Sequence, residues 1–90
     1  MNISDVNKIV GSNIKACRLK QGLSGDQLAS LMGCSQQHVS RIERGAVRLS
    51  IDNLCFIAFI LNVNAHDLIT DLGFKLSTEE TLADYYHVWD

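Results

Sequence analysis

The chain has 90 residues, which leaves room for one domain with one core. Hydrophobic residues make up 47% and charged residues 20%, so the composition excludes a wholly disordered chain. The net charge of −2 is divided unevenly, because residues 1–50 carry seven basic and three acidic side chains (+4) and residues 51–90 one basic and seven acidic (−6). Such a division fits a basic face for phosphates and an acidic end, or two ordinary solvated faces.

Apolar residues at helical spacing, bounded by capping residues, run through nearly the whole chain and predict an all-α fold. The first predicted helix spans residues 4–21, with Ser4 as its cap, and Gly22 ends it in the left-handed conformation. A second, short helix opens with a capping box between Ser24 and Gln27. The helix ends at Gly33.

Four more predicted helices follow, and no segment shows the alternation of a strand. Ser35 caps a third helix that Gly45 ends. Ser50 caps a strongly apolar fourth helix, and Asn64 caps a short fifth helix that runs to about residue 69. A further capping box at Ser77 opens a sixth.

The second and third predicted helices have the spacing of a helix-turn-helix. Ala29 is the small residue that lets the two helices cross in contact, and Gly33 supplies a positive φ for the short turn. Val39 and Ile42 provide branched apolar anchors on the inner face of the third helix. These four positions together predict a helix-turn-helix unit.

The outer face of the third predicted helix is polar and rich in hydrogen-bond donors, which are Gln36, Gln37, Ser40, Arg41 and Arg44. Glutamine can pair bidentately with adenine, and arginine with guanine, in the major groove. The N-terminus of this helix, capped by Ser35, offers backbone N–H groups to a phosphate. A polar face by itself is ordinary for an exposed helix. The spacing of the inner positions is what favours DNA recognition.

From Val10 to Ile69 the sequence resembles the Cro/C1-type (XRE) helix-turn-helix family. The likeness rests on Gly11, Ile14, RLKQGLS at 18–24, Leu28-Ala29, Gly33, SQQHVSRIERG at 35–45, the apolar positions of 54–61 and NVNAHDLI at 62–69. It implies a compact five-helix, lambda-repressor-like DNA-binding domain over residues 1–70. It also implies a homodimer on operator DNA, with half-sites about one helical turn (~34 Å) apart. The run at 35–45 also resembles that of enterobacterial fimbria-linked motility regulators.

The resemblance also assigns roles to single residues. It places Gln36, Gln37 and Arg41 over base edges and Ser35, Ser40 and Arg44 near phosphate or base. It pairs Arg18 with Glu43, so Arg18 is expected to orient the recognition helix rather than to contact DNA. Two positions depart from the family: Gly25 stands where a glutamine usually helps to hold a phosphate, and Leu49 where proline often precedes the fourth helix. Arg48 stays a predicted phosphate contact.

The rest of the sequence predicts no catalytic or metal-binding site. Cys17, Cys34 and Cys55 are odd in number and widely spaced, so we expect buried free thiols rather than a zinc site or disulfides. The histidines, with His38 expected to face solvent or DNA, lack metal-ligand spacing. With neither a catalytic constellation nor a phosphate loop, we expect no enzyme, cofactor or metal. The longest apolar run has seven residues, and the N-terminus lacks a signal-peptide pattern, so we expect a cytoplasmic protein without a membrane partner.

Residues 71–90 lie beyond the resemblance and combine acidic with aromatic side chains. They contain too many apolar groups for a free tail, so they either fold back or pack against the same segment of a second subunit. We favour a dimerisation helix, because operator binding requires two copies. The sequence therefore predicts a dimeric transcriptional regulator, and a repressor rather than an activator. The alternative is an antitoxin whose acidic tail binds a toxin and which also represses its own operon.

Overall fold

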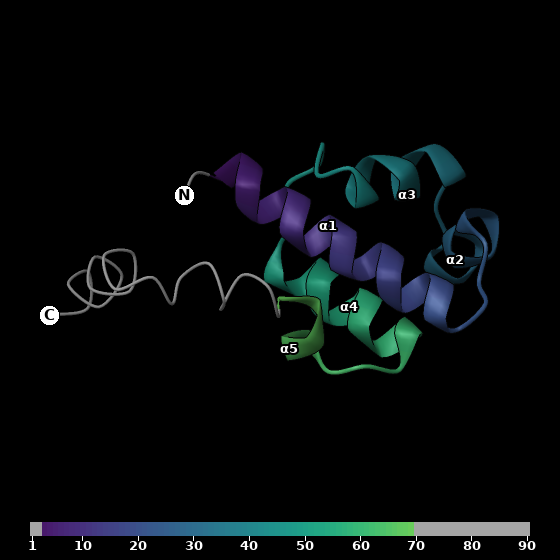
Figure 1. Ribbon diagram of the computed structural model, residues 1–90. Helices are drawn as coiled ribbons and strands as arrows, with labels where there is room; N and C mark the ends of the chain where they lie inside the picture. The colour runs from purple at the N-terminus through teal and green to yellow at the C-terminus, as the bar shows by residue number, and fades with distance from the viewer. Residues whose placement is uncertain (1–2, 70–90) are drawn as a thin grey trace, which may run out of the picture.

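In the computed structural model, which describes residues 3–69, the chain forms five α-helices and no residue of that range is in a strand (Figure 1). The helices are α1 (Ile3–Lys20), α2 (Gly25–Met32), α3 (Gln36–Glu43), α4 (Ile51–Leu61) and α5 (Ala65–Leu68). The all-α, five-helix prediction is confirmed. The predicted sixth helix and the predicted dimerisation segment at 71–90 lie outside the described residues.

The long helix α1 runs through the middle of the described part, with α3 on one side of it and α4 and α5 on the other (Figure 1). Contacts join α1 to α3, α4 and α5, and join α2 to α3 and α4. Every helix contributes to one core, made of Val10, Ile14, Leu28, Ala29, Val39, Ile42, Ile57, Ala58, Leu61 and Leu68. The position of α3 is therefore set by packing, chiefly against α1 and α2.

Side-chain caps set the starts of three helices. The Ser24 hydroxyl accepts a hydrogen bond from the Gln27 backbone N–H at 3.0 Å, and the Gln27 side chain accepts from the Ser24 N–H at 2.7 Å, as the predicted capping box requires. The Ser35 and Ser50 hydroxyls each accept from the backbone N–H three residues on, both at 3.1 Å. The predicted cap at Ser4 is wrong, since α1 already includes the residue before it.

The prediction that the cysteines are buried is wrong in part. Cys55 is exposed, and Cys17 and Cys34 are only half-buried, although all three are free thiols. The reason for Cys55 is that α4 packs on its neighbours by one face only. That inner face holds Ile57, Ala58 and Leu61, whereas Ile51 and Phe59 of the same helix are among the most exposed large apolar side chains of the described residues.

Candidate nucleic-acid interface

The turn between α2 and α3 fixes how these helices meet. Gly33 has φ 70°, a conformation that costs glycine little and other residues much. The Cys34 N–H donates to the Ala29 carbonyl at 2.9 Å and closes the last turn of α2. Ser35 caps α3 immediately afterwards. Only Gly33 and Cys34 therefore separate the end of α2 from the cap of α3, in keeping with the short turn that the sequence predicted.

The inner face of α3 is anchored in the core. Val39 and Ile42 are 2% and 3% exposed, and Ala29 of the preceding helix is 3% exposed. The inner positions of the predicted helix-turn-helix are thus confirmed as buried packing residues. Because α3 has only eight residues, these two anchors hold most of its length.

The close approach of α1 to the end of α3 depends on Gly11. A Cβ atom at this position would lie 2.3 Å from the Ile42 carbonyl oxygen and 2.7 Å from the Glu43 carbonyl oxygen. Any side chain would push the two helices apart. Sequence reasoning found Gly11 only as a matching position of the family, because its packing partner is 31 residues away along the chain.

A buried ion pair joins the same two helices. Arg18 of α1 donates from Nε to Glu43 Oε2 at 2.7 Å and from Nη2 to Oε1 at 3.0 Å, and its Nη1 donates to the Leu23 carbonyl at 2.9 Å. Both charged side chains are less than a tenth exposed. The hydrogen bond to Glu43 raises the pKa of Arg18, against the opposing effect of burial and with the carboxylate charge adding to it. Arg18 therefore orients α3 from inside, as expected, and does not face solvent.

The predicted contact residues lie on the opposite face of α3. Those exposed are Ser35, Gln36, Gln37, Ser40, Arg41 and Arg44, with Arg48 exposed in the connection to α4. A shallow hollow of about 240 Å³ is lined by Gln37, Ser40, Arg41 and Arg44. The Arg44 side chain folds back along its helix, where Nε donates to the Ser40 carbonyl at 3.3 Å. The structure thus brings Gln37, Ser40, Arg41 and Arg44 together around one hollow. Ser35 and Gln36 are exposed at the N-terminal end of α3, and Arg48 lies beyond its C-terminal end.

His38 is not among them, and the prediction that it faces solvent or DNA is wrong in part. Its side chain is half-buried and lines a hollow of about 140 Å³, together with Met32, Cys34, Ile42, Leu49, Asn53, Phe56 and Ile57. The physical reason is its register: it precedes the buried Ile42 by four residues, so it lies on the inner face of α3. Leu49, which stands where the family often has proline, lines the same hollow.

The start of α2 lies beside the start of α3. A Cβ atom on Gly25 would be 3.6 Å from both Cγ and Nε2 of Gln36, which is ordinary van der Waals contact. The position where the family usually has a phosphate-holding glutamine is therefore next to a predicted base-contacting residue. Glycine leaves that space open here.

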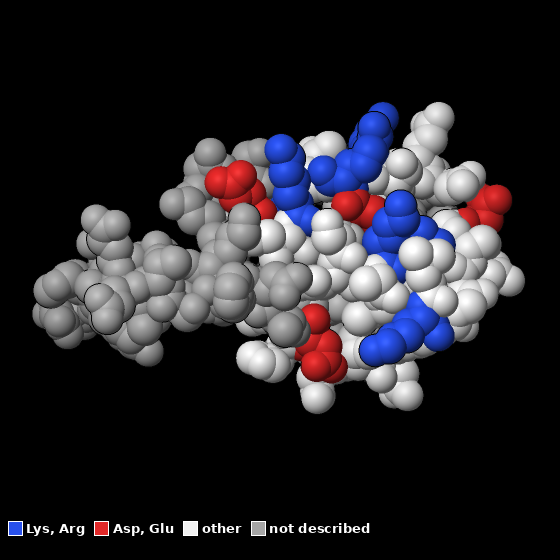
Figure 2. Space-filling model, viewed as in Figure 1, with Lys and Arg blue, Asp and Glu red and all other residues white. Residues whose placement is uncertain are grey.

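The charged groups of residues 3–69 are mixed over the surface. Seven basic and five acidic side chains fall in this range, for a net charge of +2. Figure 2 shows basic groups over the side of the molecule that carries α1 and α3, with acidic groups between them.

No group of three His, Cys, Asp or Glu residues within the described range could hold a metal ion. None of the described helices is long and apolar enough to cross a membrane.

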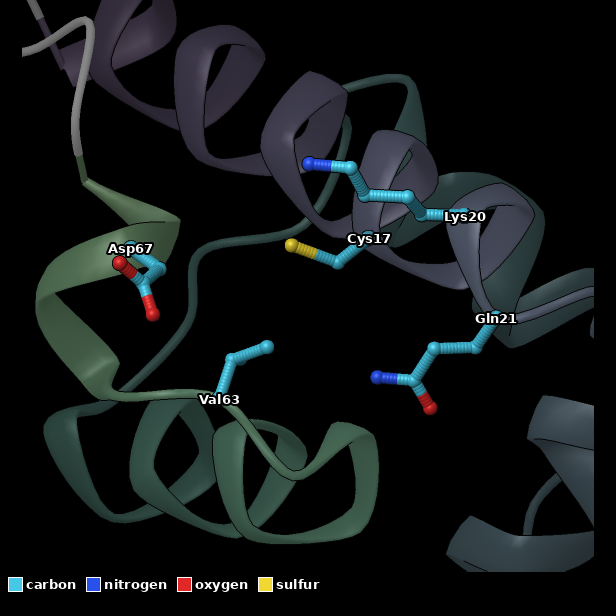
Figure 3. Close-up of a pocket in the computed structure, with 5 residues that line it drawn as sticks. All are labelled: Cys17, Lys20, Gln21, Val63 and Asp67. Atoms are coloured by element: carbon cyan, nitrogen blue, oxygen red, sulfur yellow. The ribbon is translucent and has the colours of Figure 1, made fainter.

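A separate hollow of about 580 Å³ lies where the end of α1 faces the connection between α4 and α5 (Figure 3). Its walls are Cys17, Lys20, Gln21, Val63 and Asp67. The Gln21 amide donates to the Leu61 carbonyl and so joins the ends of α1 and α4. No pattern in the sequence indicates this contact, since its partners are 40 residues apart. The hollow shares no residue with the exposed face of α3.

Comparisons with known proteins settle the family. The family model "Helix-turn-helix" matches residues 14–68 of this chain. The chain belongs to the helix-turn-helix family. Within it, the chain is 35% identical over 66 residues to the HTH-type transcriptional regulator y4dJ of Sinorhizobium fredii, over 73% of this chain and 86% of that protein. It is 28% identical over 71 residues to the control protein C.SmaI of Serratia marcescens, over 79% of this chain and 84% of that protein.

Solved structures of helix-turn-helix proteins resemble this one along most of its length. The restriction-modification controller protein C.AhdI of Aeromonas hydrophila matches with a TM-score of 0.69 and 26% identity, over 76% of this chain and 99% of that one. An HTH_3 family transcriptional regulator of Vibrio cholerae matches with a TM-score of 0.73 and 28% identity, over 87% of this chain and 44% of that one. The resemblance to Cro/C1-type regulators is confirmed, and the chain is a transcriptional regulator with a helix-turn-helix DNA-binding domain.

Proposed function

We propose that this helix-turn-helix regulator binds operator DNA as a homodimer and represses transcription there, with α3 in the major groove. One observation carries the proposal: α3 is anchored by its inner face and presents a polar, donor-rich outer face to solvent. A helix of this kind fits the width of the major groove of B-DNA, where base pairs differ in their donors and acceptors. The protein acts in the cytoplasm by occupying DNA and carries out no enzymatic reaction.

Within this proposal, three residues contact bases. Gln37 and Arg41 are four residues apart, so they project from the same face of α3. Neither side chain forms a hydrogen bond within residues 3–69, so all their polar groups stay available to bases. Gln36 is exposed at the N-terminal end of α3, the end that usually enters the groove first.

Four further residues contact the phosphate backbone. Ser35 stands at the N-terminus of α3, where backbone N–H groups and the helix dipole favour an anion. Ser40, Arg44 and Arg48 follow the outer face toward the connection to α4. The Arg44 side chain lines the same hollow as Gln37, Ser40 and Arg41, and its Nε donates to the Ser40 carbonyl of its own helix. Such contacts set the register of the protein on DNA and carry no sequence information by themselves.

The short length of a single recognition helix supports the proposed homodimer. An α3 of eight residues spans only a few base pairs, and two copies on one face of the duplex read a site long enough to be specific. The names of two matched proteins, a control protein and a restriction-modification controller protein, are consistent with a regulator of gene expression. The antitoxin alternative depends on residues 71–90 and stays a prediction.

Selection of bound sequences from random DNA, with the full chain, tests the proposal. We expect a two-fold symmetric sequence whose half-sites are about one helical turn, ~34 Å, apart or a multiple of that. Enrichment of a single half-site would overturn the homodimer, and no enrichment would overturn sequence-specific binding. The selected operator is then placed over a reporter promoter. Lower expression with the regulator present supports repression, and unchanged or higher expression contradicts it.

A further inference from the structure

The connection that follows α3 lies directly against the first half of α1. Gly45, with φ 78°, is the second residue after that helix, and a Cβ atom on it would be 2.6 Å from Lys8 Cγ and 2.7 Å from Lys8 Cα and N. The two segments therefore meet at a point where only glycine leaves enough room. The Ala46 N–H donates to the Arg41 carbonyl at 2.9 Å and holds the connection in this position.

The side of α1 that carries Lys8 is the side that faces the end of α3. Gly11, three residues further on, is the position where a Cβ atom would overlap the Ile42 and Glu43 carbonyl oxygens. Arg18, ten residues further on, forms the buried ion pair with Glu43. At 3.6 residues per turn, these three positions of α1 lie within about 80° of one another around the helix. Lys8 is the exposed member of this group, whose other two members set the position of α3.

A cation of α1 is thus brought next to the basic residues that follow α3. The Lys8 side chain is exposed, and only three bonds separate its Cγ, beside Gly45, from Nζ. Arg44 directly precedes Gly45, and Arg48 follows three residues later. The three cations come from two segments far apart in the chain, and the contact at Gly45 joins these segments. Figure 2 shows basic groups over the side of the molecule that carries α1 and α3.

We propose that Lys8 is a further DNA contact of this regulator and binds a backbone phosphate beside those bound by Arg44 and Arg48. The inference rests on the proposed function, because it needs α3 in the major groove. It adds a residue of α1 to a contact surface that the sequence predicted only for residues 35–48. The contact carries no sequence information, since the same phosphate stands at every base pair.

The length of α3 brings this end of the helix to the edge of the groove. Eight residues at 1.5 Å each make a helix about 12 Å long, which is about the width of the major groove of B-DNA. Recognition helices of helix-turn-helix proteins contact base edges with their N-terminal residues. The C-terminal end and the connection after it then approach the phosphates that border the groove. A lysine ammonium, a compact charge on a flexible stem, suits a phosphate there.

A purely structural role for Lys8 is the alternative that the test must exclude. A cation near the C-terminal end of a helix stabilises it through the helix dipole, and the Lys8 stem packs against Gly45. A structural cation would change the free energy of unfolding and leave the salt dependence of DNA binding as it is. A phosphate contact would change the salt dependence and leave the free energy of unfolding as it is.

The first experiment uses Lys8→Met in the full chain, which keeps the aliphatic stem beside Gly45 and removes the charge. Fluorescence anisotropy with the selected operator and a scrambled duplex, at several salt concentrations, measures the affinity. We expect the slope of log affinity against log salt to fall in magnitude by about 1, and both duplexes to be bound more weakly by the same factor. Lys8→Arg keeps a cation and should retain the wild-type slope. The matched control Lys20→Met removes an exposed lysine at the other end of α1 and should retain it too.

The second experiment measures whether DNA covers the amine. Lysines are acetylated with sulfo-N-hydroxysuccinimide acetate, and mass spectrometry gives the rate at each lysine with and without the operator. We expect Lys8 to react several-fold more slowly in the complex, and Lys20 to react at the same rate. Urea unfolding compares the stability of Lys8→Met with that of the wild type. Lower stability of Lys8→Met with an unchanged salt slope would assign Lys8 to the fold and overturn the phosphate contact.

The remaining outcomes separate this inference from the proposed function. A wild-type slope in Lys8→Met, or equal acetylation of Lys8 with and without DNA, overturns the phosphate contact. The proposed function then stands as long as the wild type prefers the operator to the scrambled duplex. Equal affinity of the wild type for the two duplexes overturns sequence-specific binding. A reduced slope in Lys8→Met on either duplex would in that case still support the contact between Lys8 and DNA.

Discussion

At the scale of single residues, recognition depends on side chains that never reach DNA. Arg18 and Glu43 are 25 positions apart in sequence and meet through two hydrogen bonds beneath the end of α3. A third hydrogen bond ties the same guanidinium to the Leu23 carbonyl in the connection before α2. One buried side chain therefore links α1, the start of the helix-turn-helix and the end of its second helix. It fixes the direction in which the outer face of α3 points.

The variant Glu43→Ala should lower the free energy of unfolding by about 3–5 kcal/mol, because it leaves the Arg18 cation buried without its partner. Urea unfolding followed by circular dichroism measures the change. The double variant Arg18→Met/Glu43→Leu serves as control and should be less destabilised than Glu43→Ala, since it leaves no buried charge. A loss below about 1 kcal/mol in the single variant would show that the pair contributes little.

The stability that Arg18 provides should not vary with pH in the neutral range. Its folded-state pKa is raised above the unfolded value, so the contribution is complete below the unfolded pKa and is lost only as pH rises through the folded one. That window lies in strong alkali.

Arg41 and Arg48 separate the two kinds of DNA contact. The variant Arg41→Ala should weaken binding to the selected operator by about 1–3 kcal/mol and relax the preference at one base pair, whereas Arg48→Ala should weaken binding to all sequences alike. Fluorescence anisotropy with the operator and with a scrambled duplex measures both. If Arg41→Ala weakened binding to both duplexes equally, Arg41 would be a phosphate contact.

At the scale of elements, the backbones of α1 and α3 approach each other so closely at Gly11 that no side chain fits between them. The variant Gly11→Ala should destabilise the domain by about 1–3 kcal/mol or more, because its Cβ would overlap two backbone carbonyl oxygens of α3. Gly25→Ala is the matched control, since its Cβ has space and alanine favours a helix, so we expect no loss and a gain of up to about 1 kcal/mol. Thermal unfolding compares them. Equal destabilisation by both would mean that the close approach at Gly11 is unimportant.

The starts and ends of the helices could be predicted because they depend on bonds between near neighbours. Ser24 and Gln27 are three residues apart, and Ser35 and Ser50 each cap a backbone N–H three residues on. The turn at Gly33 is likewise local. The spacing of the helix-turn-helix follows from the same local rules, so the exposed face of α3 could also be predicted.

Two features could not be predicted from the sequence. One is the contacts between residues far apart in the chain, and the other is which side of each helix its neighbours cover. Asn13 donates to the Leu68 carbonyl at 2.9 Å across 55 residues, and no pattern in either segment indicates it. The helix α4 is apolar nearly all round, so its composition could not tell the buried Ile57 from the exposed Ile51. His38 was misassigned for the same reason, because α3 is polar on both sides of its buried stripe.

At the scale of the whole molecule, an overall negative chain carries a DNA-binding domain with a net charge of +2 over residues 3–69. The acidic side chains of residues 71–90 account for the difference in sign. Long-range attraction to DNA is therefore weak for the molecule as a whole, and binding must depend on local cations near α3. The described part has seven basic residues, and three of them belong to α3 or to the connection after it. Arg41 lies on the helix, and Arg44 and Arg48 lie in the connection that follows it.

The salt dependence of DNA binding tests this distribution of charge. Each cation that neutralises a phosphate releases condensed counterions, so the logarithm of affinity falls linearly with the logarithm of salt concentration. Arg44→Ala and Arg48→Ala should each reduce the magnitude of the slope by about 1. Lys20→Ala should leave it unchanged, because Lys20 lies at the end of α1 beside the hollow of Figure 3 and shares no surface with α3. Titrations of one operator at several salt concentrations give the three slopes. If Lys20→Ala reduced the slope as much as the two arginine variants, the DNA would have to contact the end of α1, and the proposed orientation of the regulator on its operator would be wrong.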